Sequence, residues 1–267
     1  MKKQIEAIRR EIDAVDEEMA VLFLRRMKAV EAVMQAKRNA GVQVLDRERE
    51  EEIKSRLSDR FDGEGEKEAL QEFISCLLTL SKRFQYRRLS EKALVLIGFM
   101  GTGKTTVGRL LAEKLCAPFE EIDEQIEKDR GKSIQEIFAA EGENFFRRIE
   151  REKIRELYQK ILRETRESRS LRRVISCGGG AVLCEENVGN LQKIGYLVLL
   201  TADLSSIRQR LSGDRSRPLL LGKKDAQVRD FMKRREAIYR AVNPDIIVDT
   251  SGKSPEEISE EILGRLY

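Results

Sequence analysis

The sequence predicts two domains, an all-α domain of three helices followed by an α/β domain with a parallel sheet. Residues 4–39 contain neither Gly nor Pro and carry apolar residues at helical spacing. Beyond about residue 92, short apolar runs alternate with helical stretches, as in a parallel sheet whose strands are connected by helices. The first of these runs ends in a glycine-rich segment that leads into an amphipathic helix.

The first 90 residues are expected to form the three helices. Gly41 ends the first one, whose apolar positions are Ile5, Ile8, Ile12, Val15, Met19, Leu22, Val30 and Val33. A second helix is expected over 46–58, a turn over 61–66 and a third helix over 67–88. At ~1.5 Å per residue, the first helix spans about 50 Å, which is too long for a 90-residue domain to cover. We therefore expect a homodimer through these helices.

Four apolar runs predict the strands of the second domain, at residues 93–97, 174–177, 196–200 and 246–248. The pattern changes near residues 87–92, which places the domains at 1–90 and 91–267. Residues 164–173 are charged and aperiodic, so we expect a solvated loop or the end of a helix there.

Composition excludes several classes of protein. Lys and Arg total 51 against 47 acidic residues, without a basic block, so no nucleic-acid partner is expected. No apolar run approaches the ~18 residues that span a bilayer, and the charged N-terminus does not resemble a signal peptide. With no His and four cysteines that lack C-x-x-C spacing, a zinc site is not expected. We expect a cytoplasmic protein whose acid–base chemistry uses carboxylates, Lys or Arg.

Residues 98–105 read GFMGTGKT and match the phosphate-binding pattern G-x-x-x-x-G-K-[ST]. A chance glycine-rich turn is the alternative, but the preceding strand and the following helix are the context that the motif requires. Backbone N–H groups and the helix N-terminus would hold nucleotide phosphates. Lys104 would reach the β- and γ-phosphates of ATP, and Thr105 would bind Mg²⁺. The expected nucleotide-binding residues of the loop are Gly101, Thr102, Gly103, Lys104, Thr105 and Thr106.

Further motifs follow the loop in a fixed order: FEEID, IFAAEGENFFRRIE, CGGGAV, RSRPLL, KRREAIY and VDTSGKSP. From about residue 93 to the C-terminus, this order resembles the shikimate kinases. The resemblance implies phosphoryl transfer from ATP to shikimate, a small carboxylate that carries three hydroxyls. The implied shikimate-binding residues are Asp123, Arg147, Gly178, Gly179, Gly180 and Arg235.

The resemblance also implies roles for individual residues. Arg147 and Arg235 would bind the carboxylate, and Asp123 would orient the attacked hydroxyl and accept its proton. Arg217 would be the lid arginine that neutralises charge on the transferred phosphoryl group. Arg210 and Lys253 match positions that lie beside the adenine of ATP in that family. Glu121 departs from the family, in which an aspartate is usual two residues before Asp123, so the metal position is in doubt.

Cations interrupt the apolar face of the first helix. Continuing from Leu22 in steps of three and four residues gives Arg26, Val30, Val33 and Lys37, while Arg9 lies near the other end. Buried charges are costly unless they are paired. These cations could extend to solvent or pair with internal glutamates. They could also line an anion pocket among the helices.

Residues 4–88 resemble the all-helical chorismate mutases, through IRREIDAVDEEMAVLFLRR, GVQVLDRERE and S-x-x-x-Q. The resemblance implies an intertwined dimer in which Arg9 reaches the partner's pocket. Arg9, Arg26 and Glu50 would hold a compact conformer of chorismate, and Lys37 and Gln85 would donate to its ether oxygen. The implied chorismate-binding residues are Arg9, Arg26, Lys37, Asp46, Glu50, Ser81 and Gln85.

Two alternatives remain open from the sequence. The helical domain could have kept its pocket only to sense chorismate or prephenate, or only to dimerise. The second domain could phosphorylate another small polyol or acid.

Overall fold

The computed structural model describes residues 2–39, 47–58, 63–89, 92–166, 172–211 and 225–266. The chain separates into two compact units between Leu89 and Ser90. No helix within these ranges is both long enough and apolar enough to cross a membrane.

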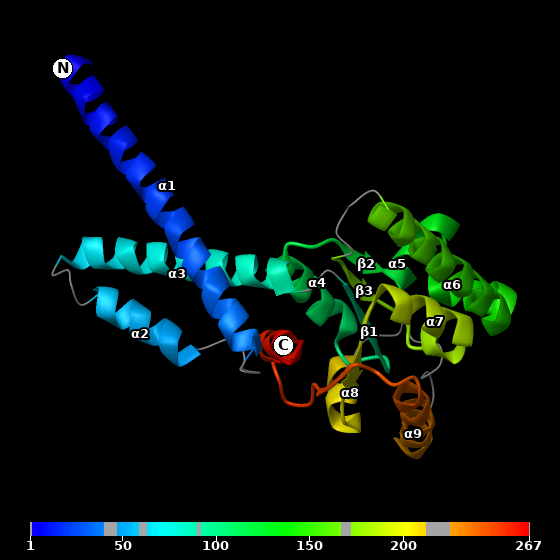
Figure 1. Ribbon diagram of the computed structural model, residues 1–267. Helices are drawn as coiled ribbons and strands as arrows, with labels where there is room; N and C mark the ends of the chain where they lie inside the picture. Colours follow the sequence, from blue (N-terminus) through cyan, green and yellow to red (C-terminus); the bar gives the residue numbers. More distant parts are fainter. Residues whose placement is uncertain are drawn as a thin grey trace. The chain divides into compact units, whose positions relative to one another are not determined.

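The N-terminal unit consists of three helices, α1 (Lys2–Asn39), α2 (Arg47–Ser58) and α3 (Glu64–Leu89) (Figure 1). Helix α3 packs against both α1 and α2. The buried apolar side chains are Met27 and Met34 of α1 and Ile74 and Leu78 of α3. The predicted turn at 61–66 is wrong in part, because α3 already begins at Glu64. Acidic residues at this end favour the helix N-terminus through the helix dipole.

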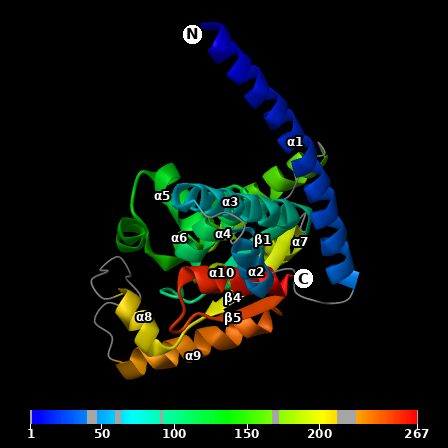
Figure 2. The same ribbon diagram turned by 90° about the vertical axis from the view of Figure 1, so that its left-hand side faces the viewer.

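The N-terminal half of α1 extends beyond α2 and α3 (Figures 1 and 2). We call its apolar side the α1 stripe, and its residues are between 45% and 59% exposed: Ile5, Ile8, Ile12, Val15, Met19 and Leu22. One copy of the chain therefore does not cover this face, as the length of the helix predicts. The stripe has helical spacing but no partner within the described residues of the N-terminal unit.

The second unit contains a five-stranded sheet in the order β2-β3-β1-β4-β5, and all of its pairings are parallel. Its strands are β1 (Ala93–Gly98), β2 (Phe119–Glu121), β3 (Val174–Ser176), β4 (Gly195–Thr201) and β5 (Ile246–Asp249). The parallel sheet confirms the predicted α/β class. Strand β2 was not predicted from the sequence and forms one edge.

Helices cover both faces of the sheet. Successive strand residues point to opposite faces, and both faces of β1 are apolar and buried. Val95 and Ile97 of β1 pack in a core with α5 (Ile122–Arg130), α6 (Ile134–Arg166) and α7 (Glu185–Ile194). On the other face, α4 (Lys104–Leu115) contacts α10 (Pro255–Arg265), which also lies beside β5 (Figure 2). The remaining helices are α8 (Leu204–Leu211), α9 (Asp225–Ala241) and the 3₁₀ helix η1 (Ala181–Leu183).

The charged segment 164–173 is only partly described, because residues 167–171 lie outside the description. Helix α6 runs through Arg166. Arg173 is only 5% exposed and pairs with Glu164 and with Glu120, the latter at 3.4 Å. The prediction of a solvated segment is therefore wrong at Arg173, because two carboxylates compensate its burial.

Candidate active sites

The phosphate loop connects β1 to α4 at the carboxyl end of the sheet. Strand β1 lies between β3 and β4, so the chain order reverses beside it, and ligands of α/β sheets bind at such points. Gly101 and Gly103 have φ values of 78° and 92°, which favour glycine. Gly103 caps α4 without a side-chain hydrogen bond. The first N–H groups of α4 therefore have no competing cap and suit an anion.

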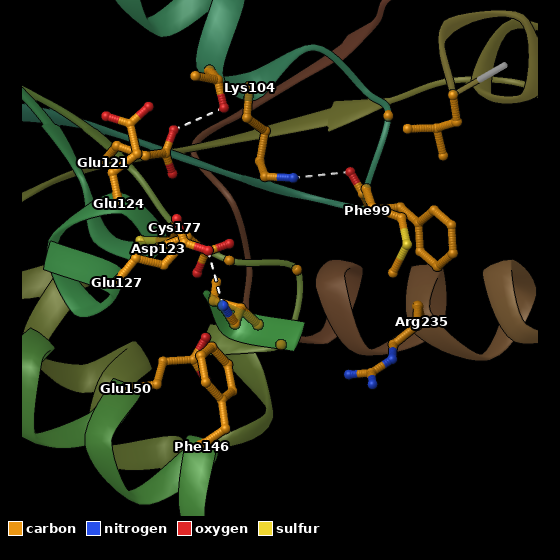
Figure 3. A pocket seen from close by; sticks show the side chains of 18 of the residues that line it. Phe99, Lys104, Glu121, Asp123, Glu124, Glu127, Phe146, Glu150, Cys177 and Arg235 are labelled. Carbon is orange, nitrogen blue, oxygen red and sulfur yellow. Dashed lines mark hydrogen bonds between the residues drawn. The ribbon is translucent and has the colours of Figure 1, made fainter. Parts of the chain in front are cut away.

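Lys104 lies across this loop. Its Nζ donates to the carbonyl oxygens of Gly98 at 3.0 Å and Phe99 at 2.9 Å (Figure 3). Thr102 Oγ1 donates to the same Phe99 carbonyl at 2.8 Å. These bonds hold the ammonium group over the loop, within reach of the space that phosphates would fill.

Thr105 and Glu121 supply oxygen atoms beside Lys104. Thr105 Oγ1 donates to Glu121 Oε2 at 2.8 Å, and both residues line one cavity. Burial raises the pKa of Glu121, and the bond from Thr105 opposes that effect. The described residues hold no cluster of three or more metal-binding His, Cys, Asp or Glu side chains. This donor set fits Mg²⁺ that takes its other ligands from phosphates and water.

The cavity has a volume of about 710 Å³ and extends from the phosphate loop to α6 and α9. It brings together Lys104, Thr105, Asp123, Arg147, Arg210, Arg235 and Gly178 to Gly180. Phe138 and Phe146 form an apolar wall, with ring centroids 4.9 Å apart. Most of the residues predicted to bind ATP and shikimate therefore share one space, although Thr102 and Lys253 do not line it.

Two glutamates orient Arg147. Its Nη1 donates to Glu150 Oε2 at 2.8 Å and its Nη2 to Glu143 Oε1 at 3.0 Å. Burial lowers the pKa of Arg147, but the two carboxylates outweigh this effect and raise it overall. The guanidinium fills the position that a Cβ on Gly180 would need. Gly180 therefore provides the space that Arg147 occupies.

Glu150 and Asp123 face each other below the glycines. A Cβ on Gly178 would lie 2.6 Å from Asp123 Oδ1 and 2.9 Å from Glu150 Oε1. Glu150 is 1% exposed, and burial raises its pKa to about 7, although Arg147 acts in the opposite direction. Asp123 adds to the increase. These carboxylates form an acidic wall opposite Arg235 (Figure 3).

Arg235 extends from α9 toward this space (Figure 3). Its guanidinium lies 5.0 Å from the ring centroid of Phe231, in cation–π geometry. Nη1 is buried and has no hydrogen-bond partner within the described ranges. Stacking therefore orients Arg235 while leaving a donor for a ligand.

The remaining residues predicted to bind the nucleotide do not all lie at the cavity. Arg210 donates to Thr250 Oγ1 at 2.9 Å and to the Thr250 carbonyl at 2.6 Å, beside the phosphate loop. Lys253 pairs with Glu261 at 2.7 Å and is not among the residues that line the cavity. Arg217 lies outside the described residues.

In the N-terminal unit, α3 gathers polar side chains toward α1 and α2. Arg26 of α1 donates to Ser81 Oγ, and burial lowers the pKa of Arg26. Glu50 of α2 pairs with Lys82 of α3 at 2.8 Å. Arg26 is thus anchored by α3 and is not simply extended into solvent, and Glu50 already has a cationic partner.

The other residues assigned to chorismate lie apart or outside the description. Lys37 and Gln85 are half-buried, on α1 and α3. Arg9 is exposed and lies 17 residues before Arg26, about 26 Å along α1 at the helical rise. One copy of the chain therefore does not bring Arg9 to Arg26. Asp46 lies outside the described residues.

Several contacts were missed from the sequence. Lys82 pairs with Glu50, Tyr239 Oη donates to the Gly179 carbonyl, and Phe231 stacks on Arg235. The i, i+4 spacing of Phe231 and Arg235 was the available signal for the stacking of these two side chains. The sequence held no comparable signal for Lys82, because its partner comes from another helix.

Comparison with known proteins agrees with this geometry. A family model described as shikimate kinase matches residues 100–267. The chain belongs to the shikimate kinase family. Shikimate kinase from Persephonella marina is 40% identical over 171 residues, which cover 64% of this chain and 96% of that relative. The enzyme from Thermodesulfovibrio yellowstonii is 41% identical over 173 residues, covering 64% and 93% of the two chains.

Solved structures give the same result for the second unit. Shikimate kinase from Acinetobacter baumannii in complex with shikimate is 35% identical and has a TM-score of 0.57. The match covers 64% of this chain and 90% of that one. For shikimate kinase from Aquifex aeolicus the identity is 32% and the TM-score is 0.52.

A second family model, chorismate mutase type II, matches residues 8–86. A chorismate mutase domain therefore precedes the shikimate kinase domain in this chain. This order confirms the fusion predicted from the sequence.

Proposed function

We propose that the chain is a bifunctional enzyme of the shikimate pathway. The second domain phosphorylates shikimate to shikimate 3-phosphate with ATP, and the helical domain isomerises chorismate to prephenate. For the kinase, the observation that supports the proposal most is the shared cavity, which Lys104 and Thr105 line together with Asp123, Arg147 and Arg235. For the mutase, it is the anchoring of Arg26 by Ser81 beside the Glu50–Lys82 pair.

In the kinase reaction, Arg147 and Arg235 bind the shikimate carboxylate through charge-assisted hydrogen bonds. Asp123 accepts the proton of the attacking hydroxyl. Lys104 and the first N–H groups of α4 hold the transferred phosphate of ATP, and Arg217 offsets its charge. Thr105 and Glu121, together with the phosphates, would hold Mg²⁺, which would neutralise part of the phosphate charge. The apolar wall of Phe138 and Phe146 reduces the number of water molecules that can compete with the substrate hydroxyl.

The mutase reaction needs no nucleophile, because chorismate rearranges within one molecule. Arg26 and Glu50 hold the compact conformer through a carboxylate and a hydroxyl. Lys37 and Gln85 stabilise the negative charge that develops on the ether oxygen. Asp46 and Ser81 complete the substrate contacts.

The mutase site also requires a homodimer. In one copy the α1 stripe is exposed and Arg9 lies about 26 Å from Arg26 along the helix. Pairing of two N-terminal units covers the stripe and allows Arg9 to reach the partner's pocket. Large apolar stripes of this kind are typical of subunit interfaces. The four cysteines are free, in keeping with a cytoplasmic enzyme.

Two single substitutions test the assignment. Arg147→Ala should abolish shikimate phosphorylation while preserving ATP binding and chorismate turnover. Lys37→Ala should abolish chorismate turnover while preserving the kinase. If a folded dimer of the whole chain leaves chorismate unchanged, the sensor alternative replaces the mutase, although the match over residues 8–86 does not favour it. A screen of other small polyols and acids with ATP tests the remaining alternative.

A further inference from the structure

One face of α9 connects the two loops of the kinase site. Phe231, Arg235 and Tyr239 are spaced four residues apart, so they lie on the same side of the helix, and all three line the cavity. At one end, the Phe231 ring packs against the Phe99 ring of the phosphate loop, with centroids 5.5 Å apart. At the other end, Tyr239 contacts the glycine segment. Arg235 lies between these two contacts.

The contact of Tyr239 is a hydrogen bond to backbone. Its Oη donates to the carbonyl oxygen of Gly179 at 2.6 Å, and the side chain is only 3% exposed. Burial raises the pKa of Tyr239, so the phenol keeps its proton and remains a donor. A buried bond of this kind fixes the carbonyl, because losing the partner would leave a buried acceptor unsatisfied.

This bond also determines where the next N–H points. In a trans peptide, the carbonyl of one residue and the N–H of the next point in opposite directions. No cis peptide occurs in the described chain. With the Gly179 carbonyl directed to Tyr239, the Gly180 N–H is directed away from Tyr239. Within the ranges that the structure describes, that N–H has no backbone partner, whereas Ala181 N–H donates to Gly178.

We infer that Tyr239 is a positioning residue of the kinase site, which holds the Gly179–Gly180 peptide so that the Gly180 N–H binds the acceptor substrate beside Arg147. This inference rests on the proposed kinase function. Arg147 occupies the space at Gly180, so a carboxylate bound to its guanidinium lies next to this N–H. Tyr239 also ties the peptide to the helix that carries Arg235. The two arginines and the N–H thus form one carboxylate site.

The test is Tyr239→Phe in the whole chain, with Tyr196→Phe as a matched control. Tyr196 lies on β4 outside the cavity, and its contact with Lys92 is through the ring, so it loses a hydroxyl without touching the site. Tyr239→Phe should raise the KM for shikimate about five- to tenfold, the scale of one hydrogen bond. The KM for ATP should change less than twofold. The rise in Tm that ATP produces should stay nearly the same. A merely structural role would instead lower the Tm without this split.

A shikimate KM within twofold of wild type, in a folded Tyr239→Phe variant, overturns the inference. So does an equal rise in the KM values for shikimate and ATP. Hydrogen exchange in the wild type gives a second measurement that does not depend on the variant's folding. Shikimate should slow exchange of the Gly180 amide, and unchanged exchange contradicts the inference. If shikimate neither raises the wild-type Tm nor is phosphorylated, the proposed function fails and the inference fails with it.

Discussion

The guanidinium of Arg147 occupies the space in which residue 180 would carry its Cβ, so the arginine and the glycine depend on each other. Gly180→Ala should therefore displace Arg147 and reduce kcat/KM for shikimate at least a hundredfold, as expected when a charge-assisted contact is lost. ATP binding should persist, because the phosphate loop is not displaced. Steady-state kinetics with each substrate varied in turn measures the change.

The control for this variant is Gly189→Ala. Gly189 lies in α7, and apart from its chain neighbours and the adjacent helix backbone, no atom lies within 4 Å of the position that its Cβ would take. This substitution should leave the kinase unchanged and stabilise the helix slightly. Retention of shikimate affinity in Gly180→Ala would contradict the placement of Arg147.

Glu150 should make the stability of the kinase domain depend on pH. Burial raises the pKa of Glu150 to about 7 in the folded state, above the ordinary value of 4.5. Between pH 4.5 and 7 the folded state therefore binds more protons than the unfolded state. Its stabilising contribution is complete below about pH 4.5 and is lost as the pH rises through about 7, at a cost of about 3 kcal/mol.

Urea unfolding of the wild type and of Glu150→Gln at several pH values measures this contribution. The difference in free energy of unfolding between the two proteins should shift in favour of the variant as the pH rises from 4.5 to 7.5. A constant difference across that range would show that Glu150 stays ionised in the folded protein.

The α1 stripe should hold the dimer together. Ile12→Lys places a charge in the middle of the stripe and should yield monomers that lose mutase activity but keep kinase activity. Glu17→Lys is the control, because Glu17 lies on the opposite side of α1 and is exposed. Light scattering coupled to size-exclusion chromatography reports the mass. A dimeric, mutase-active Ile12→Lys protein would exclude this interface.

Lys82 should matter to the mutase, because it pairs with Glu50 in a half-buried position at 2.8 Å. Lys82→Met removes the partner and should lower kcat/KM for chorismate about tenfold, since Glu50 loses its orientation. Lys54→Met is the matched control, because Lys54 forms a more exposed pair with Glu51 on α2. Equal kinetics for the two variants would remove Lys82 from the mutase site.

The sequence predicted most of the architecture because its signals are local. Helical spacing predicted α1, and the apolar runs predicted β1, β3, β4 and β5. Strand β2 was missed because its three residues, Phe119–Glu121, include two glutamates, which have low strand propensity. Its hydrogen bonds to β3 form the strand in spite of this local preference. A strand at the edge of a sheet needs little apolar character of its own.

Prediction of the sites was limited by partners that come from other elements. The phosphate loop is contiguous, so its residues could be assigned directly. The buried pairing of Arg173 with Glu164 and Glu120, and that of Lys82 with Glu50, depend on packing between elements. The exposure of the α1 stripe in a single copy was expected from the length of the helix, whereas the spacing of its apolar residues alone does not distinguish a subunit interface from burial within one chain.

The central claim is that one chain carries two active sites, and two assays on one preparation of the whole chain test it most directly. Shikimate with ATP and Mg²⁺ should yield ADP, and chorismate alone should yield prephenate. Lys104→Ala should remove only the first activity and Lys37→Ala only the second. Loss of both activities in either variant, or the absence of one activity from the folded wild type, would contradict the account.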